Sequence, residues 1–180
     1  MIFVPFVVIQ LVDGHYLWAL IIFVAAGFSD GLDGLLARIL HQQTLLGQYL
    51  DPIADKLLLS TMFLVLSILH HIPWKYTVVV FSRDVSILAA SAVLFAIAGL
   101  RDFRPSIFGK ANTFSQISAI FFVLLFAVRR SRWIWIARVV FLRATFIFTI
   151  LSALHYVILV QQRLREHAHA LPPAPTTRVI

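Results

Sequence analysis

The sequence predicts an all-α membrane protein that crosses the bilayer six times. Hydrophobic residues make up 61% of its 180 residues and charged residues only 13%, whereas about a quarter of the residues in soluble proteins are charged. The mean hydropathy is correspondingly high, at +0.92. Apolar stretches recur along the chain, and most approach the ~20 residues that a helix needs to cross the hydrocarbon core. These features exclude an ordinary soluble domain.

Six apolar segments follow one another along the chain. They cover about residues 2–12, 17–40, 46–69, 76–100, 112–128 and 134–160. The stretches "VDGHY", "HHIPWK", "RDFRPSIFGK" and "RRSRW" interrupt them with turn-forming or basic residues. The opening "MIFVPFVVIQ" has neither the basic region nor the small-residue cleavage site of a secretory signal. We therefore interpret it as the second half of a membrane helix whose beginning is missing.

The chain is expected to form one membrane domain at residues 1–160, followed by a polar, Pro-containing tail at 161–180 that is disordered in its last part. There is no Cys, which excludes disulfides and thiolate metal sites. The net charge of +7 would suggest nucleic acid for a soluble protein. In a membrane protein, basic side chains are expected at the membrane faces, against anionic headgroups or around phosphate. The expected partner is therefore the bilayer and not nucleic acid.

The basic residues also bear on orientation. With six spans, the second and fourth connections and the tail share one side of the membrane. That side carries Arg101, Arg104, Lys110, Arg163, Arg165 and Arg178. An excess of Lys and Arg marks the cytoplasmic side, so we assign this side to the cytoplasm. Lys75 and the three arginines of "RRSRW" would lie on the other side, so charge alone does not decide the orientation.

Four of the eight acidic residues fall within 26 residues of this apolar sequence, at Asp30, Asp33, Asp51 and Asp55. Two sets of helical spacings group them with small residues. The sets are Asp30, Asp33, Gly34 and Ala37 at i, i+3, i+4 and i+7, and Gly47, Asp51 and Asp55 at i, i+4 and i+8. Each set lies on one face of a helix. Two adjacent antiparallel helices would then direct four carboxylates into one volume.

Such a cluster predicts a divalent cation, because four close carboxylates would otherwise repel one another and take up protons. Oxygen ligands favour magnesium, manganese or calcium, and phosphate oxygens of a substrate are expected to complete the coordination. Gly34, Ala37 and Gly47 leave room for a ligand, and the guanidinium of Arg38 suits phosphate. Each small residue alone would more simply be explained by helix packing. Four carboxylates inside a membrane are costly and indicate function.

The pattern Asp30-x2-Asp33-Gly34-x2-Ala37-Arg38-x8-Gly47-x3-Asp51-x3-Asp55 resembles the signature of the CDP-alcohol phosphatidyltransferases at all eight fixed positions. The resemblance implies a six-helix fold, often dimeric, in the bacterial inner membrane, with a cytoplasm-facing cavity that holds two Mg²⁺ or Mn²⁺ ions and a CDP-linked lipid. It implies that Asp30, Asp33 and Asp51 bind metal and that Asp55 touches the metal site and acts as the base. The implied CDP-lipid site consists of Asp30, Gly34, Ala37, Arg38 and Gly47.

The surrounding sequences "SDGLDGLLAR" and "GQYLDPIADKLLLS" resemble the branch of that family that makes phosphatidylglycerophosphate or cardiolipin. This implies transfer of a phosphatidyl group from CDP-diacylglycerol to an alcohol, with release of CMP. Glycerol-3-phosphate is the favoured acceptor, and phosphatidylglycerol, which would give cardiolipin, is the alternative.

An anionic acceptor needs a cation inside the membrane boundary, and Arg83 in "FSRDVS" and Lys110 in "FGKANTFSQ" are the candidates. Arg83 and Asp84 could instead form a simple interfacial pair. Lys110, Thr113 and Gln116 match a Lys-x2-Thr-x2-Gln segment of the same branch. A divalent-cation transporter is a remote alternative. It is disfavoured because the carboxylates cluster at one depth and Arg38 would repel a permeating cation.

Overall fold

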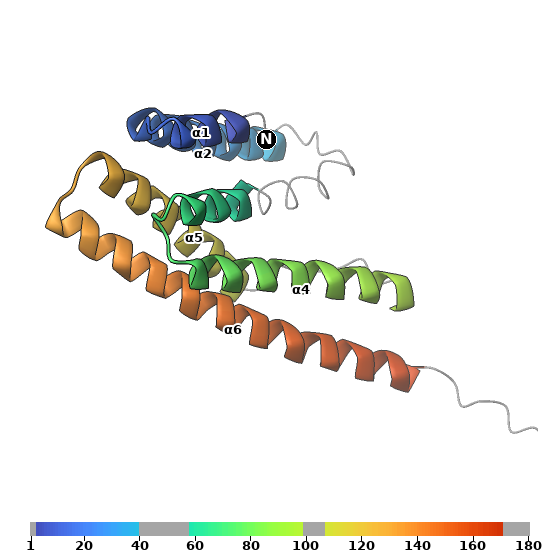
Figure 1. Cartoon of the computed structure of the whole chain (residues 1–180). Coiled ribbons are helices and arrows are strands. Elements are labelled where there is room, and N and C mark those ends of the chain that lie inside the picture. Colours follow the sequence, from blue (N-terminus) through green and yellow to red (C-terminus); the bar gives the residue numbers. More distant parts are fainter. Residues whose placement is uncertain (1–2, 40–57, 99–106, 171–180) are drawn as a thin grey trace, which may run out of the picture.

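The computed structural model describes the backbone of residues 3–39, 58–98 and 107–170, and these residues form helices joined by short turns (Figure 1). The helices are α1 (Phe3–Val12), α2 (Tyr16–Ile39), a helix at Leu58–Ile68, α4 (Trp74–Ala98), α5 (Ile107–Val128) and α6 (Arg132–Ala170). The predicted all-α class is thus confirmed for the described residues. Two stretches among them, Gly109–Val128 and Arg132–His155, are long and apolar enough to cross a membrane.

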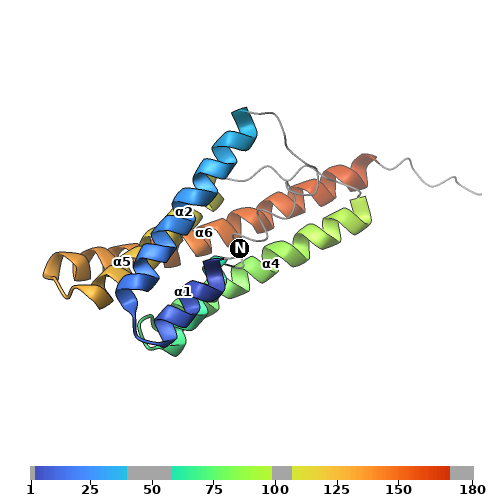
Figure 2. The ribbon, with the colours of Figure 1, turned by 90° about the horizontal axis from the view of Figure 1, so that it is seen from above.

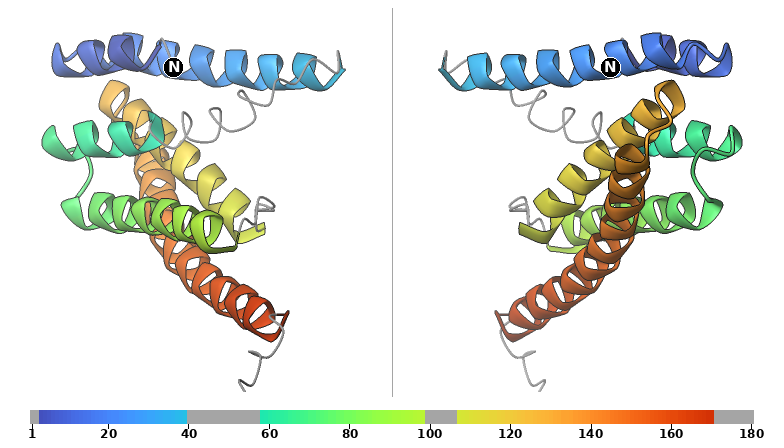
Figure 3. Two further views of the ribbon diagram at one scale, coloured as in Figure 1. Left: turned by 90° about the vertical axis from the view of Figure 1, so that its right-hand side faces the viewer. Right: turned by 90° about the vertical axis from the view of Figure 1, so that its left-hand side faces the viewer.

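The helices form a bundle in which α1 and α2 lie side by side above the others (Figures 1 and 3). α5 packs along α6, which also contacts α4, and α2 rests on α5. Figure 2 shows that the turns after α1, after the helix Leu58–Ile68 and after α5 all lie at one end of the bundle. α2, α4 and α6 end at the opposite end. The molecule therefore has two distinct ends, which we call the turn end and the motif end, since the second half of α2 carries Asp30 and Asp33.

Two residues in the left-handed backbone region shape the turn end. Gly14 has φ of 76° and closes α1, where its amide donates to the Leu11 carbonyl at 3.2 Å. This conformation is the usual helix stop for glycine. His70 has φ of 60° after the helix Leu58–Ile68, an uncommon conformation for a residue with a side chain. Pro73 then precedes the first residue of α4, a position that tolerates its missing amide hydrogen.

The apolar core lies between α1, α2, the helix Leu58–Ile68 and α5. Its largest fully buried side chains are Leu11, Met62, Phe63, Leu66, Ile72, Ile120 and Leu124. Large apolar side chains also cover the outside of the bundle, including Phe6, Phe28, Val78, Phe114 and Leu154. An outer surface this apolar is unusual for a monomer in water, and it suits contact with lipid.

Two helices are longer than the sequence predicted. α5 begins at Ile107, so Lys110, expected in a connection, lies on a helix. α6 continues to Ala170, ten residues beyond the end predicted for the sixth segment. Polar residues propagate a helix once it is nucleated, and the first proline after Arg132 is Pro172, whose preceding residue disfavours helical backbone. The first half of the predicted third segment, and residues 101–106 of the predicted connection "RDFRPSIFGK", lie outside the described residues.

His71 links α2 and α6 at the turn end through contacts with Tyr16 and Arg138. Its carbonyl accepts a hydrogen bond from Nη2 of Arg138 at 2.5 Å, and its ring packs edge-on against Tyr16 at 5.1 Å. Arg138 also lies over the ring of Phe126 at 5.2 Å. Burial lowers the pKa of His71 below its ordinary 6.5, and the nearby charges of Arg138 and Arg130 lower it further. The imidazole is therefore held neutral between three helical segments.

Protonation of His71 should weaken the fold. Because its pKa is lower in the folded state, the unfolded chain takes up the proton first, and stability falls as pH drops below about 6.5. We expect the thermal unfolding midpoint in detergent to fall between about pH 7.5 and about pH 5.5, and His71→Gln to remove part of this fall. His15→Gln, at an exposed histidine of the α1–α2 turn, is the control. An identical fall in wild type and His71→Gln would contradict this assignment.

Candidate active site

The first half of the acidic motif lies on the second half of α2. Asp30, Asp33, Gly34, Ala37 and Arg38 all fall within Tyr16–Ile39, whose backbone is helical. The first four of these residues are spaced to share one face of a helix, and their backbone is indeed helical. The side chains of Asp30 and Asp33 are not among those that the structure describes.

The second half of the motif, Gly47, Asp51 and Asp55, lies outside the described residues. Among the side chains that the structure does describe, no cluster of acidic or histidine residues forms a metal site. The predicted convergence of four carboxylates remains a prediction. The donor set itself, with oxygen ligands only, fits hard divalent cations.

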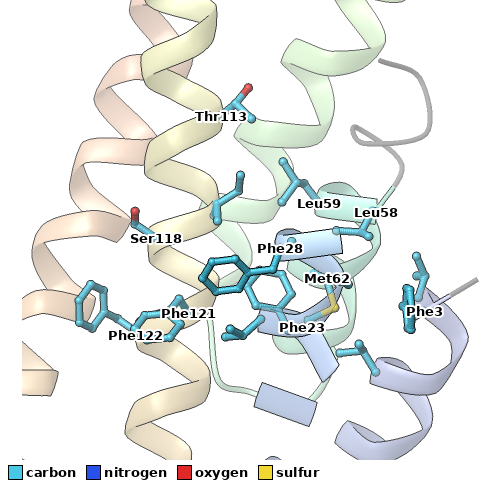
Figure 4. Close-up of a pocket in the computed structure, with 16 residues that line it drawn as sticks. Phe3, Phe23, Phe28, Leu58, Leu59, Met62, Thr113, Ser118, Phe121 and Phe122 are labelled. Atoms are coloured by element: carbon cyan, nitrogen blue, oxygen red, sulfur yellow. The ribbon is translucent and has the colours of Figure 1, made fainter. Parts of the chain in front are cut away.

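An apolar cavity of about 550 Å³ adjoins the motif (Figure 4). Four helices line it: α1 with Phe3, Val4 and Val7; α2 with Phe23, Val24, Ala26, Gly27 and Phe28; the helix Leu58–Ile68 with Leu58, Leu59 and Met62; and α5 with Thr113, Ile117, Ser118, Phe121 and Phe122. Phe28 comes two residues before Asp30, and Leu58 comes three residues after Asp55. The volume is in the usual range for a ligand pocket, and the chemistry of the lining suits a hydrocarbon chain.

The cavity has a polar and an aromatic part. Figure 4 shows Thr113 above Ser118 on α5, with Phe121 and Phe122 below them. Thr113 is exposed, and its hydroxyl donates to the carbonyl of Gly109 at 3.1 Å. Lys110 lies on the same helix, one turn earlier, and is exposed. A ligand with a polar head and an apolar tail could thus lie along α5 with its head toward Lys110.

Arg83 does not lie at an interface but inside the bundle, where it is 8% exposed. Its Nη1 lies 2.7 Å from Oδ1 of Asp84, and its Nη2 donates to Oγ of Ser152 at 2.8 Å. Ser60 donates to the other oxygen of Asp84 at 3.2 Å. Three helical segments therefore meet at this ion pair. Nε of Arg83 is buried and has no hydrogen-bond partner among the described residues, so its N–H remains an unused donor.

A second polar cluster lies between α5 and α6, and sequence reasoning missed it. Thr149 donates to Oδ1 of Asn112 at 2.9 Å, and Gln116 and Thr145 are buried beside them, one helical turn along each helix. Within the part of the chain that the structure describes, Nδ2 of Asn112, Nε2 of Gln116 and Oγ1 of Thr145 have no hydrogen-bond partner. The available signal was the spacing of Thr145, Thr149 and Ser152 on an otherwise apolar helix, which places three hydroxyls on one face. Such residues hold membrane helices together.

The geometry around the motif can be compared with known proteins. A family model of the CDP-alcohol phosphatidyltransferases matches residues 1–151. The chain belongs to the CDP-alcohol phosphatidyltransferase family. The match includes both halves of the acidic motif, Arg83 and Lys110, and the resemblance drawn from the motif is confirmed.

Relatives within the family carry the names of two reactions. The chain is 35% identical over 140 residues to a Mycobacterium tuberculosis protein named phosphatidylglycerophosphate synthase; the aligned part is 78% of this chain and 63% of the relative. It is 30% identical over 149 residues to the CDP-diacylglycerol–glycerol-3-phosphate 3-phosphatidyltransferase of Blochmanniella floridana, covering 82% of this chain and 77% of the relative. A Mycobacterium bovis protein named cardiolipin synthase is 36% identical over 97 residues, which are 54% of this chain and 46% of the relative. The chain thus spans less than two thirds of the mycobacterial relatives that it matches.

The buried ion pair predicts an asymmetric response to mutation. Asp84→Asn leaves the Arg83 charge inside the bundle without its carboxylate, and we expect a loss of about 3–5 kcal/mol in the free energy of unfolding. The double variant Arg83→Met/Asp84→Asn removes both charges and should be the more stable of the two. Unfolding in mixed micelles, followed by circular dichroism, measures both. A double variant at least as unstable as Asp84→Asn would show that the pair is not what stabilises this region.

Proposed function

We propose that this chain transfers a phosphatidyl group from CDP-diacylglycerol to glycerol-3-phosphate, with divalent metal, releasing CMP and forming phosphatidylglycerophosphate. The observation that carries the proposal is the complete family signature, together with an apolar cavity lined by Phe28 and Leu58, which flank the signature in the sequence. The signature supplies the groups that handle a diphosphate. The cavity supplies the apolar volume that a lipid substrate needs.

We also propose that the protein crosses a bacterial inner membrane six times and opens its active site to the cytoplasm. Two helices long enough to span, an apolar outer surface and bacterial relatives support this placement. The resemblance further favours a homodimer.

The metal site is proposed to consist of Asp30, Asp33, Asp51 and Asp55, which together would hold two Mg²⁺ or Mn²⁺ ions. Ions bound there would neutralise the diphosphate and the charge that develops on the departing CMP. Arg38 would hold a phosphate oxygen with its guanidinium. Asp30, Gly34, Ala37 and Gly47 would border the nucleotide, where the small residues allow close approach.

The chain's own chemistry is the handling of one proton and one hydroxyl. Asp55 accepts the proton of the acceptor hydroxyl. The hydroxyl oxygen then forms a bond to the lipid-bearing phosphorus, and the bond from that phosphorus to the CMP oxygen breaks. Because a carboxylate is a weak base toward an alcohol, positioning must supply much of the rate. An acyl chain would lie in the apolar cavity and fix the lipid end of the substrate.

The acceptor site is proposed to use Arg83 and Lys110. Lys110 is exposed on α5, one helical turn before Thr113 of the cavity. Arg83 is engaged by Asp84 and Ser152 through its two terminal nitrogens, and its buried Nε has no hydrogen-bond partner among the described residues. Lys110 is therefore the more accessible cation for the phosphate of the acceptor, and Arg83 would contribute one donor from the interior.

Cardiolipin synthesis, with phosphatidylglycerol as acceptor, is the second candidate. It is favoured by the relatives named cardiolipin synthase, including the human protein, 44% identical over 73 residues that form 40% of this chain. An assay of the purified protein distinguishes the two reactions. The protein is given CDP-diacylglycerol with either glycerol-3-phosphate or phosphatidylglycerol, and the products are identified by mass. We expect phosphatidylglycerophosphate and CMP with Mg²⁺ or Mn²⁺, and no product in chelator. Cardiolipin from phosphatidylglycerol would favour the second reaction, and CMP release in chelator would exclude the metal mechanism.

The assignment of Asp55 makes a separate prediction. Asp55→Asn removes the base but keeps an oxygen ligand, so we expect turnover to fall by about 10²-fold or more while binding of CDP-diacylglycerol persists. Asp33→Asn should instead weaken metal binding and raise the Mg²⁺ concentration needed for half-maximal activity. Turnover by Asp55→Asn near the wild-type rate would refute the base assignment.

The acceptor residues are tested through the Michaelis constant. Lys110→Gln should raise the KM for glycerol-3-phosphate about tenfold, the effect of losing one charge-assisted phosphate contact, with little change for CDP-diacylglycerol. Arg83→Lys keeps a charge opposite Asp84 but loses the guanidinium donors, and should also raise this KM. Equal losses for both substrates in Arg83→Lys would show that Arg83 has only a structural role.

A further inference from the structure

All four tryptophans of the chain lie at the turn end. Trp18 is the third residue of α2, Trp74 opens α4, and Trp133 and Trp135 lie in the first turn of α6. Their exposed fractions run from 50% to 79%. Figures 1 and 2 show the corresponding helix starts together at one end of the bundle. Tryptophan is enriched at the headgroup level of membranes, so these rings mark one membrane boundary.

The same end is strongly basic. Arg129 and Arg130 occupy the α5–α6 turn, Arg132 opens α6, and Lys75 follows Trp74, and all four are exposed. Among the described residues the only salt bridge is the interior pair of Arg83, so no described carboxylate pairs with these cations. Asp13 is the one acidic residue at the described turns. Four cations that form no salt bridge with a described carboxylate thus lie at the same end of the bundle as four exposed indole rings.

The α5–α6 turn, which carries Arg129 and Arg130, is fixed to the bundle by contacts of Arg138. Arg138 bonds the carbonyl of His71 and lies over Phe126 near the end of α5. These contacts join the α5–α6 turn to the turn before α4. The arginines of the α5–α6 turn and Lys75, which follows the turn before α4, therefore belong to one surface.

We propose that this surface, formed by Arg129, Arg130, Arg132 and Lys75 among the four tryptophans, binds the headgroups of anionic phospholipids. Guanidinium groups match phosphate oxygens in shape and charge. Basic residues at a membrane surface favour anionic over zwitterionic lipid. A bilayer covers the cations, the indole rings and the apolar helix faces beyond them at once, whereas an acidic protein or nucleic acid would cover only the cations. The surface lies away from the motif, because Trp18 and Asp30 are 12 residues apart on α2, about 18 Å along the helix.

Tryptophan fluorescence tests this directly, because every tryptophan reports on this surface. The full chain is placed in phosphatidylcholine vesicles that contain brominated phosphatidylglycerol or brominated phosphatidylcholine at the same fraction. We expect stronger quenching by the brominated anionic lipid. Arg129→Gln/Arg130→Gln should lower the relative affinity for phosphatidylglycerol by about tenfold or more. The matched control Arg163→Gln/Arg165→Gln removes two charges at the other end of α6 and should keep the preference.

Equal quenching by the two lipids in wild type would overturn the proposal, as would a preference that both double variants lose to the same extent. If circular dichroism shows that Arg129→Gln/Arg130→Gln has lost helix, the test rests on the wild-type protein alone. Its preference for phosphatidylglycerol over phosphatidylcholine must then weaken as the salt concentration rises to about 1 M. The proposal rests on the membrane placement given above but not on the reaction. Release of the chain from vesicles by alkaline carbonate would overturn both, whereas absent CMP release with an intact lipid preference would overturn the reaction alone.

Discussion

The cost of placing charge in an apolar bundle constrains the rest of this structure. An Arg buried beside mid-helix apolar residues persists only with a counter-charge and hydrogen bonds. Asp84 supplies the charge and Ser152 accepts a second hydrogen bond from Arg83, while Ser60 donates to the other oxygen of Asp84. Because these partners come from α4, α6 and the helix Leu58–Ile68, satisfying one side chain fixes the relative positions of three segments. The cluster of Asn112 and Thr149 joins α5 to the same face of α6.

The two ends of the bundle divide the chemistry between them. The motif end carries the acidic residues of α2 and the apolar cavity, where we propose that the lipid substrate binds. The turn end carries exposed arginines and tryptophans and suits the surface of a bilayer. The helices between the two ends separate the acidic residues of α2 from the cationic surface of the turn end.

Family membership and the geometry support each other but bear on different questions. The family match covers residues 1–151 and assigns the motif to a class of chemistry. The relatives carry the names of two kinds of enzyme, phosphatidylglycerophosphate synthase and cardiolipin synthase. Lys110 and Arg83, which we propose contact the acceptor, lie outside the signature.

Hydropathy and the fixed spacing of Asp, Gly and Arg are local properties, so the amino-acid sequence was enough to predict the helical, strongly apolar character and the family. It predicted most helix bounds to within a few residues, and it missed the extension of α6 because polar composition does not by itself end a helix. Only the tertiary structure decided the environment of Arg83, since its partner Ser152 lies 69 residues away. The same holds for the cavity, which four helices form together, and for the gathering of four tryptophans at one end. Contacts between distant residues depend on how helices pack, and no local pattern encodes that.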